Sequence, residues 1–175
     1  DLICPLHGPV LAENLGYYID KYNTWSSYAP EDKGVLVAYA SIYGGTKKAA
    51  ELLGEKLKAA GVEKVVVSDL ARSDMAEVIE DAFRYDRMVV AAPTYDAGLF
   101  PVMEDFLNHL KAKNYSNRKV GVIENGTWAP MAAKKMTEIL ATLKNVTLAE
   151  TVVMVKSTLN AESEAAMDKL VQELV

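Results

Sequence analysis

A loop of small and hydroxyl-bearing residues, Ser41-Ile42-Tyr43-Gly44-Gly45-Thr46, stands between an apolar run and an amphipathic pattern. The run is typical of a strand, and the pattern that begins near Lys47 is typical of a helix. The first N–H groups of a helix lack intrahelical partners, and the helix dipole favours negative charge beside them. Glycine lets such a loop close around an anion. With the hydroxyls of Ser41 and Thr46 as further donors, the loop is predicted to bind a phosphate ester.

The spacing of this loop differs from that of the two best-known nucleotide loops. Neither G-x-G-x-x-G nor G-x-x-x-x-G-K-[ST] occurs in the chain. A tight turn followed by a helix cap is the alternative interpretation of the same residues. We expect Lys47 and Lys48, which follow the loop, to face solvent.

Two further loops combine an aromatic ring with small polar residues. Pro93-Thr94-Tyr95-Asp96-Ala97-Gly98 and Asn125-Gly126-Thr127-Trp128 each follow an apolar run. Tyr95 and Trp128 could sandwich a flat heterocycle, since offset stacking adds about 0.5–1.5 kcal/mol to the burial of area. Packing in the core or at an interface is the alternative role of these rings. A phosphate ester joined to a flat ring system indicates flavin mononucleotide (FMN).

Five short apolar runs alternate with helical patterns along the chain. They lie at 35–40, 62–67, 88–92, 120–123 and 152–155. Strands that are apolar almost throughout are buried on both faces, as in a parallel sheet covered by helices on both sides. We therefore predict a doubly wound, five-stranded α/β fold whose ligand lies outside the carboxyl ends of the strands. The three loops follow the first, third and fourth of these runs.

Composition limits the classes of function. The 175 residues suit one domain with a small appendage. The net charge is −5, and the chain has no basic stripe, no membrane-spanning run and no signal peptide, so we expect neither nucleic-acid nor membrane binding. The single cysteine, Cys4, cannot form an internal disulfide, which indicates a reducing, cytoplasmic compartment. Because the chain begins at Asp1 and within a pattern, we expect a fragment of a longer protein.

The three loops together resemble those of the flavodoxin-like domain of flavodiiron proteins. These enzymes join a β-lactamase-like diiron domain to a C-terminal FMN domain. The loop at 41–46 resembles the family's S-x-Y-G-x-T phosphate loop, and 93–96 resembles its P-T-x-N-type loop, with Asp96 where Asn is common. The loop at 125–128 resembles its third loop, which often is Gly-Ser-Tyr-Gly-Trp.

This resemblance spans 34–175 and implies a flavodoxin-like fold with strand order 2-1-3-4-5. In that order FMN lies at the switch between the first and third strands. The resemblance implies that all three loops bind FMN through Ser41, Ile42, Tyr43, Gly44, Gly45, Thr46, Pro93, Thr94, Tyr95, Asp96, Ala97, Gly98, Asn125, Gly126, Thr127 and Trp128.

The N-terminal segment carries a second resemblance. Cys4-Pro5-Leu6-His7-Gly8-Pro9 resembles the motif that closes the diiron domain of the same family, where the histidine is the last iron ligand. The polar stretch 26–34 is interpreted as a linker. Residues 1–33 are therefore interpreted as the end of a β-lactamase-like domain plus a linker, and 34–175 as the FMN-binding domain. His7 would bind iron only in the full-length protein, because the H-x-E-x-D-H cluster of the other ligands is absent here.

The resemblance implies an electron-transfer function without a catalytic acid or base. The FMN domain would take electrons from a small redox protein such as rubredoxin, or from a reductase. It would pass them to the diiron site, which reduces oxygen or nitric oxide, within a full-length homodimer. A stand-alone flavodoxin or an FMN-dependent NAD(P)H–quinone reductase is the alternative. A receiver domain would need carboxylates where Ala40 and Ser41 end the first strand. A flavin-free interaction domain is a further alternative.

Overall fold

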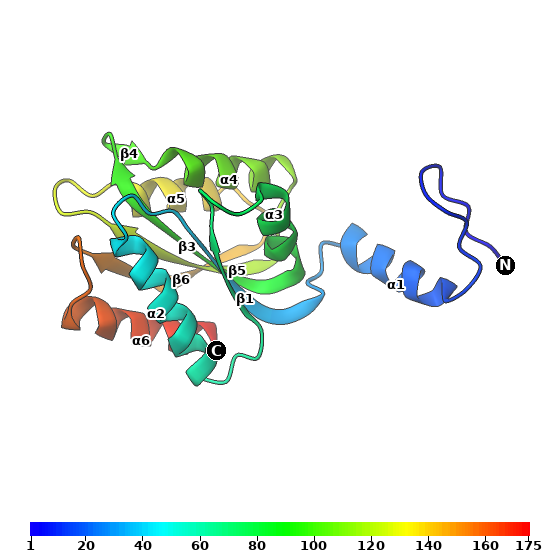
Figure 1. Ribbon diagram of the computed structural model, residues 1–175, viewed down its shortest axis with the longest axis horizontal. Helices are drawn as coiled ribbons and strands as arrows, with labels where there is room; N and C mark the ends of the chain where they lie inside the picture. Colours follow the sequence, from blue (N-terminus) through cyan, green and yellow to red (C-terminus); the bar gives the residue numbers. More distant parts are fainter.

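The computed structural model describes residues 1–175, in which a parallel sheet lies between two layers of helices (Figure 1). The elements in chain order are α1 (Leu15–Ser26), β1 (Asp32–Tyr39), α2 (Gly45–Ala59), β2 (Val65–Asp69), α3 (Met75–Arg84), β3 (Tyr85–Tyr95), β4 (Gly98–Leu99), α4 (Pro101–Ala112), β5 (Arg118–Asn125), α5 (Ala132–Leu140), β6 (Val146–Val155) and α6 (Ala161–Leu174).

The five long strands are parallel and follow the order β2-β1-β3-β5-β6. The short β4 lies off this path and pairs antiparallel with the end of β3. Counted without β4, the order is 2-1-3-4-5, so the predicted flavodoxin-like, doubly wound fold is confirmed.

Apolar side chains form a separate core on each face of the sheet. Leu36 and Ala38 of β1 belong to the core under α3, α4 and α5, whereas Val35 and Val37 belong to the core under α2 and α6 (Figure 1). Successive side chains of a strand point to opposite faces, so a strand buried on both faces has to be apolar at every position. This explains why the apolar runs of the sequence located the strands.

Most strand boundaries differ from the predicted runs by a few residues, and the starts of β2 and β6 have a local explanation. Val62, the predicted start of the second strand, precedes β2, and its amide N–H donates to Leu57 O at the end of α2. The strand β6 begins at Val146, well before the predicted run. Its first half is only partly buried, and polar residues therefore interrupt the apolar pattern there.

The N-terminal segment lies apart from the sheet and its helices, and α1 projects away from them (Figure 1). None of the residues of α1 is buried, and Tyr17, Ile19, Tyr22 and Trp25 are among its exposed apolar side chains. The helix is therefore stabilised in this chain chiefly by its own backbone hydrogen bonds.

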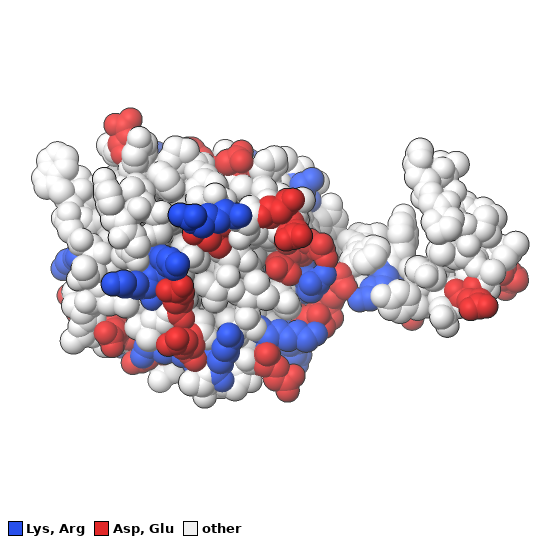
Figure 2. Space-filling view, viewed as in Figure 1, with Lys and Arg blue, Asp and Glu red and all other residues white.

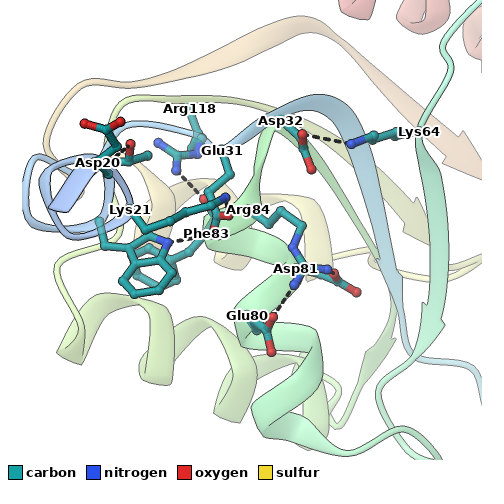
Figure 3. A network of polar contacts seen from close by, with 12 residues as sticks. Asp20, Lys21, Glu31, Asp32, Lys64, Glu80, Asp81, Phe83, Arg84 and Arg118 are labelled. Carbon is teal, nitrogen blue, oxygen red and sulfur yellow. Dashed lines mark hydrogen bonds and ion pairs between the residues drawn. The ribbon is translucent and has the colours of Figure 1, made fainter. Parts of the chain in front are cut away.

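Polar contacts connect the end of α1 with the start of β1 (Figure 3). Glu31 accepts a hydrogen bond of 2.5 Å from Lys21 Nζ and one of 2.6 Å from Trp25 Nε1. The bond from Lys21, with that from Trp25, holds the pKa of the Glu31 carboxyl below its ordinary value. Glu31, the residue before β1, thus connects α1 to the start of the sheet through these two hydrogen bonds.

A buried arginine at the start of β5, Arg118, lies beside these contacts (Figure 3). Its guanidinium donates only to backbone carbonyl oxygens, and these belong to Tyr28, Phe83, Tyr85, Ser116 and Asn117. The stretch 26–34, which the sequence predicts to be a linker, is therefore hydrogen-bonded to the domain through Tyr28 O, and residues 32–34 belong to β1.

Candidate functional site

A cavity of about 470 Å³ lies at the carboxyl ends of β1, β3, β5 and β6. Its volume falls within the range of about 300–1,000 Å³ that is usual for small-molecule sites. It includes the junction of β1 and β3, where the strand order reverses and where open α/β sheets bind their ligands. Its lining consists of Ser41, Ile42, Tyr43, Gly44, Gly45, Thr46, Lys48, Pro93, Thr94, Asn125, Ser157, Thr158 and Leu159.

The loop after β1 brings the N-terminus of α2 to this cavity. Gly44 is the N-cap with φ +87°, a left-handed conformation that favours glycine, and no side chain caps the helix. The Gly44 N–H donates to Ser41 Oγ at 3.1 Å. The N–H groups of Gly45, Thr46 and Lys47 have no acceptor within the protein. The helix dipole and three free donors therefore favour an anion at this position.

The start of α2 also packs against the loop that follows β6. A Cβ on Gly45 would lie 2.2 Å from Ser157 O and 2.9 Å from Asn125 Nδ2. Only glycine lets these backbones approach so closely. The sequence did not reveal Ser157, Thr158 and Leu159 as site residues, because they include neither glycine nor an aromatic ring. Their place after the last strand was the one available signal.

The loop after β5 is fixed by side chains at the ends of two strands. Thr94 Oγ1 accepts hydrogen bonds from the N–H groups of Met131 at 2.8 Å and Ala132 at 3.1 Å. The buried Glu124 carboxylate accepts one from the Ala133 N–H at 2.5 Å. Both side chains therefore stabilise the N-terminus of α5. Thr94, predicted to bind FMN, lines the cavity and also positions the neighbouring loop.

The two aromatic rings predicted to flank a heterocycle do not line the cavity. Tyr95 is 49% exposed and packs edge-on against Phe100, with ring centroids 5.6 Å apart. Trp128 is 88% exposed. A ring sandwich by Tyr95 and Trp128 stays a prediction. The remaining predicted residues that lie outside the lining are Asp96, Ala97, Gly98, Gly126 and Thr127.

The two lysines that follow the predicted phosphate loop have different surroundings. Lys47 forms an ion pair of 3.8 Å with Glu51 one turn along α2. Lys48 is exposed as expected, but it also borders the cavity. Elsewhere on the face shown in Figure 2, basic and acidic side chains are interspersed. Lys48 is the one cationic side chain among the residues that line the cavity.

The predicted metal ligand His7 lies exposed in the N-terminal segment. The structure contains no group of three or more His, Cys, Asp or Glu side chains arranged to hold a metal ion. The role of His7 in a longer protein stays a prediction. None of the helices combines the length and the apolar character that a membrane crossing requires.

Known proteins are similar to this chain in sequence and in fold. The family model described as flavodoxin matches residues 37–169. An uncharacterized protein of Methanocaldococcus jannaschii is 30% identical over 144 residues, which is 82% of this chain and 36% of that protein. The chain spans about a third of the length of curated relatives that it matches.

Two solved structures superpose on almost the whole chain. Rubredoxin oxygen:oxidoreductase from Desulfovibrio gigas does so with a TM-score of 0.91 at 20% identity, covering 99% of this chain and 43% of that one. A mutant of the flavo di-iron protein from Thermotoga maritima does so with a TM-score of 0.79 at 23% identity, covering 99% and 44%. At these identities the similarity shows a common fold.

Proposed function

This chain belongs to the flavodoxin family, and we propose that it binds FMN and transfers electrons. Its flavodoxin-like domain fits the corresponding domain of flavodiiron proteins. The observation that carries the proposal is the cavity at the β1–β3 junction, which holds the uncapped N-terminus of α2.

The residues of the cavity suit the phosphate of FMN. A dianion at the N-terminus of α2 would accept hydrogen bonds from the free N–H groups of Gly45, Thr46 and Lys47. The hydroxyls of Ser41 and Thr46 add neutral donors, and Lys48 adds a positive charge at the border. The missing side chain at Gly45 keeps this cradle closed against the loop after β6.

Bound FMN supplies the redox chemistry, and the chain supplies binding, orientation and electrostatics. The loops after β1, β3, β5 and β6 would hold the cofactor at the edge of the sheet. Neither a carboxylate nor a histidine lines the cavity. This lining suits a module that passes electrons and needs no acid or base of its own.

We further propose that the chain is the FMN-binding part of a flavodiiron oxygen or nitric oxide reductase. Residues 1–33 would then be the end of a β-lactamase-like diiron domain with its linker, and His7 an iron ligand in that domain. The segment Cys4–Pro9 supports this, as do relatives named rubredoxin oxygen:oxidoreductase and flavo di-iron protein. The full-length homodimer would receive electrons from rubredoxin or a reductase.

The proposal is tested by titrating the chain with FMN and with riboflavin, which lacks the phosphate. We expect the fluorescence of FMN to be quenched on binding. FMN should bind at least tenfold more tightly than riboflavin, since hydrogen bonds to a charged group contribute about 1.5–3 kcal/mol. Equal affinity for both flavins would contradict the assignment of the phosphate loop. Oxidation of NAD(P)H by the FMN-loaded chain would favour the quinone-reductase alternative.

A further inference from the structure

Asn125, at the end of β5, uses its whole amide group to connect two other loops. Its Nδ2 donates to Thr46 Oγ1 at 3.3 Å and to Ser157 O at 3.4 Å. Its Oδ1 accepts from the Ser157 N–H at 3.0 Å. An asparagine amide offers two donor hydrogens and one acceptor oxygen, and here all three functions have partners.

These partners determine which way the amide faces. The Ser157 N–H can only donate, so it requires the oxygen of Asn125 on its side. The nitrogen then faces Thr46, and because an amide nitrogen can only donate, Thr46 Oγ1 has to accept. The hydroxyl hydrogen of Thr46 is left over, and no group of the protein accepts it. Thr46 is 1% exposed and borders the cavity.

We propose that Asn125 is a positioning residue that keeps the Thr46 hydroxyl a hydrogen-bond donor toward the phosphate of the cofactor. The inference rests on the proposed FMN binding. Three successive hydrogen bonds are thus donated toward the anion. The Ser157 N–H donates to Asn125, Asn125 donates to Thr46, and Thr46 donates to the anion. A phosphate dianion only accepts hydrogen bonds, so this direction suits it. The same contacts hold the loop after β6 against the start of α2.

The direction of the donors is tested with Asn125→Asp, which keeps the shape of the side chain. One carboxylate oxygen still accepts from the Ser157 N–H. The other can now accept the Thr46 hydrogen, which turns the lone pairs of that hydroxyl toward the phosphate. We expect the dissociation constant of FMN to rise about tenfold or more and that of riboflavin to change less than about twofold. An equal loss for both flavins, or no loss, would overturn the proposal.

The same substitution made in a Thr46→Val variant distinguishes the effect of the hydrogen-bond direction on FMN binding from the effect of the added negative charge. Thr46→Val removes the hydroxyl and should itself lower the preference for FMN. Adding Asn125→Asp to Thr46→Val should then lower the preference much less than it does in the parent chain. A loss of the same size in both backgrounds would mean that charge alone acts, and would refute the positioning role.

A milder variant and a fold check complete the test. Circular dichroism and the melting temperature show whether each variant folds. If Asn125→Asp does not fold, Asn125→Ala takes its place and should reduce the ratio of riboflavin to FMN dissociation constants by a smaller factor. An unchanged ratio in a folded Asn125→Ala would also refute the role. A parent chain without any preference for FMN would instead contradict the proposed function itself.

Discussion

Replacing Gly45 by alanine should separate the phosphate loop from the loop after β6. The new Cβ would lie 2.2 Å from Ser157 O, whereas ordinary van der Waals contact begins near 3.4 Å. Both atoms belong to or adjoin backbone, so the strain cannot be relieved by turning a flexible side chain. Overpacking of this kind costs about 1–3 kcal/mol. Where the FMN-bound state carries the whole of that cost, FMN binding weakens about 5- to 150-fold.

The assay is a titration of FMN fluorescence with a matched control in the same helix. Gly54 lies in the second half of α2, and a Cβ there would lie 2.7 Å from Cγ2 of Val67 on β2. Neither residue lines the cavity. Gly54→Ala should therefore lower the melting temperature without changing the affinity for FMN. Gly45→Ala that binds FMN as tightly as the parent chain, or Gly54→Ala that weakens binding equally, would refute the reasoning.

Three further changes address the contacts of the N-terminal segment and the charge at the cavity. The hydrogen bond from Lys21 lowers the pKa of the Glu31 carboxyl in the folded chain. The contact of Glu31 with α1 is therefore fully present above about pH 4.3, the ordinary pKa of glutamate, and is lost as the pH falls through the lower folded-state pKa. The Trp25 indole N–H, followed by NMR, should lose its protection from hydrogen exchange in acid. In Glu31→Ala it should be unprotected already at pH 7, and protection in that variant would contradict the contact. Arg118→Leu leaves five carbonyl oxygens without their donor and should lower the free energy of unfolding in urea by about 3 kcal/mol or more, with unchanged FMN affinity in the folded fraction. Lys48→Met should weaken FMN binding about two- to fivefold and reduce its salt dependence. Lys47 is also exposed but does not line the cavity, so Lys47→Met, which loses only its pair with Glu51, should do neither.

The fold could be predicted from the sequence because burial on both faces leaves a direct signal. Strands that are covered by helices on both sides have to be apolar in their buried part, as β1 is from Val35 to Tyr39. The first half of β6 is partly exposed, and for that reason its start at Val146 was not visible. The strand order was implied by the resemblance of the loops, and the structure confirms it.

The candidate site was predictable only where local chemistry determines it. The turn at 41–46 into α2 follows from residue types, since Gly44 adopts a left-handed conformation at the start of the helix; its binding of a phosphate stays a prediction. The contact between Gly45 and Ser157 joins residues far apart in the sequence, and serine carries no signal of such a contact. The positions of Tyr95 and Trp128 depend on how their loops pack, which neither residue type determines.

FMN binding is the central claim, and the visible absorption spectrum of the purified chain tests it most directly. The spectrum would be recorded before adding FMN, and again after adding FMN and desalting. We expect flavin bands that stay with the protein through desalting. A folded chain that retains no flavin after FMN has been added would contradict the cofactor assignment and would favour an interaction domain that keeps the fold.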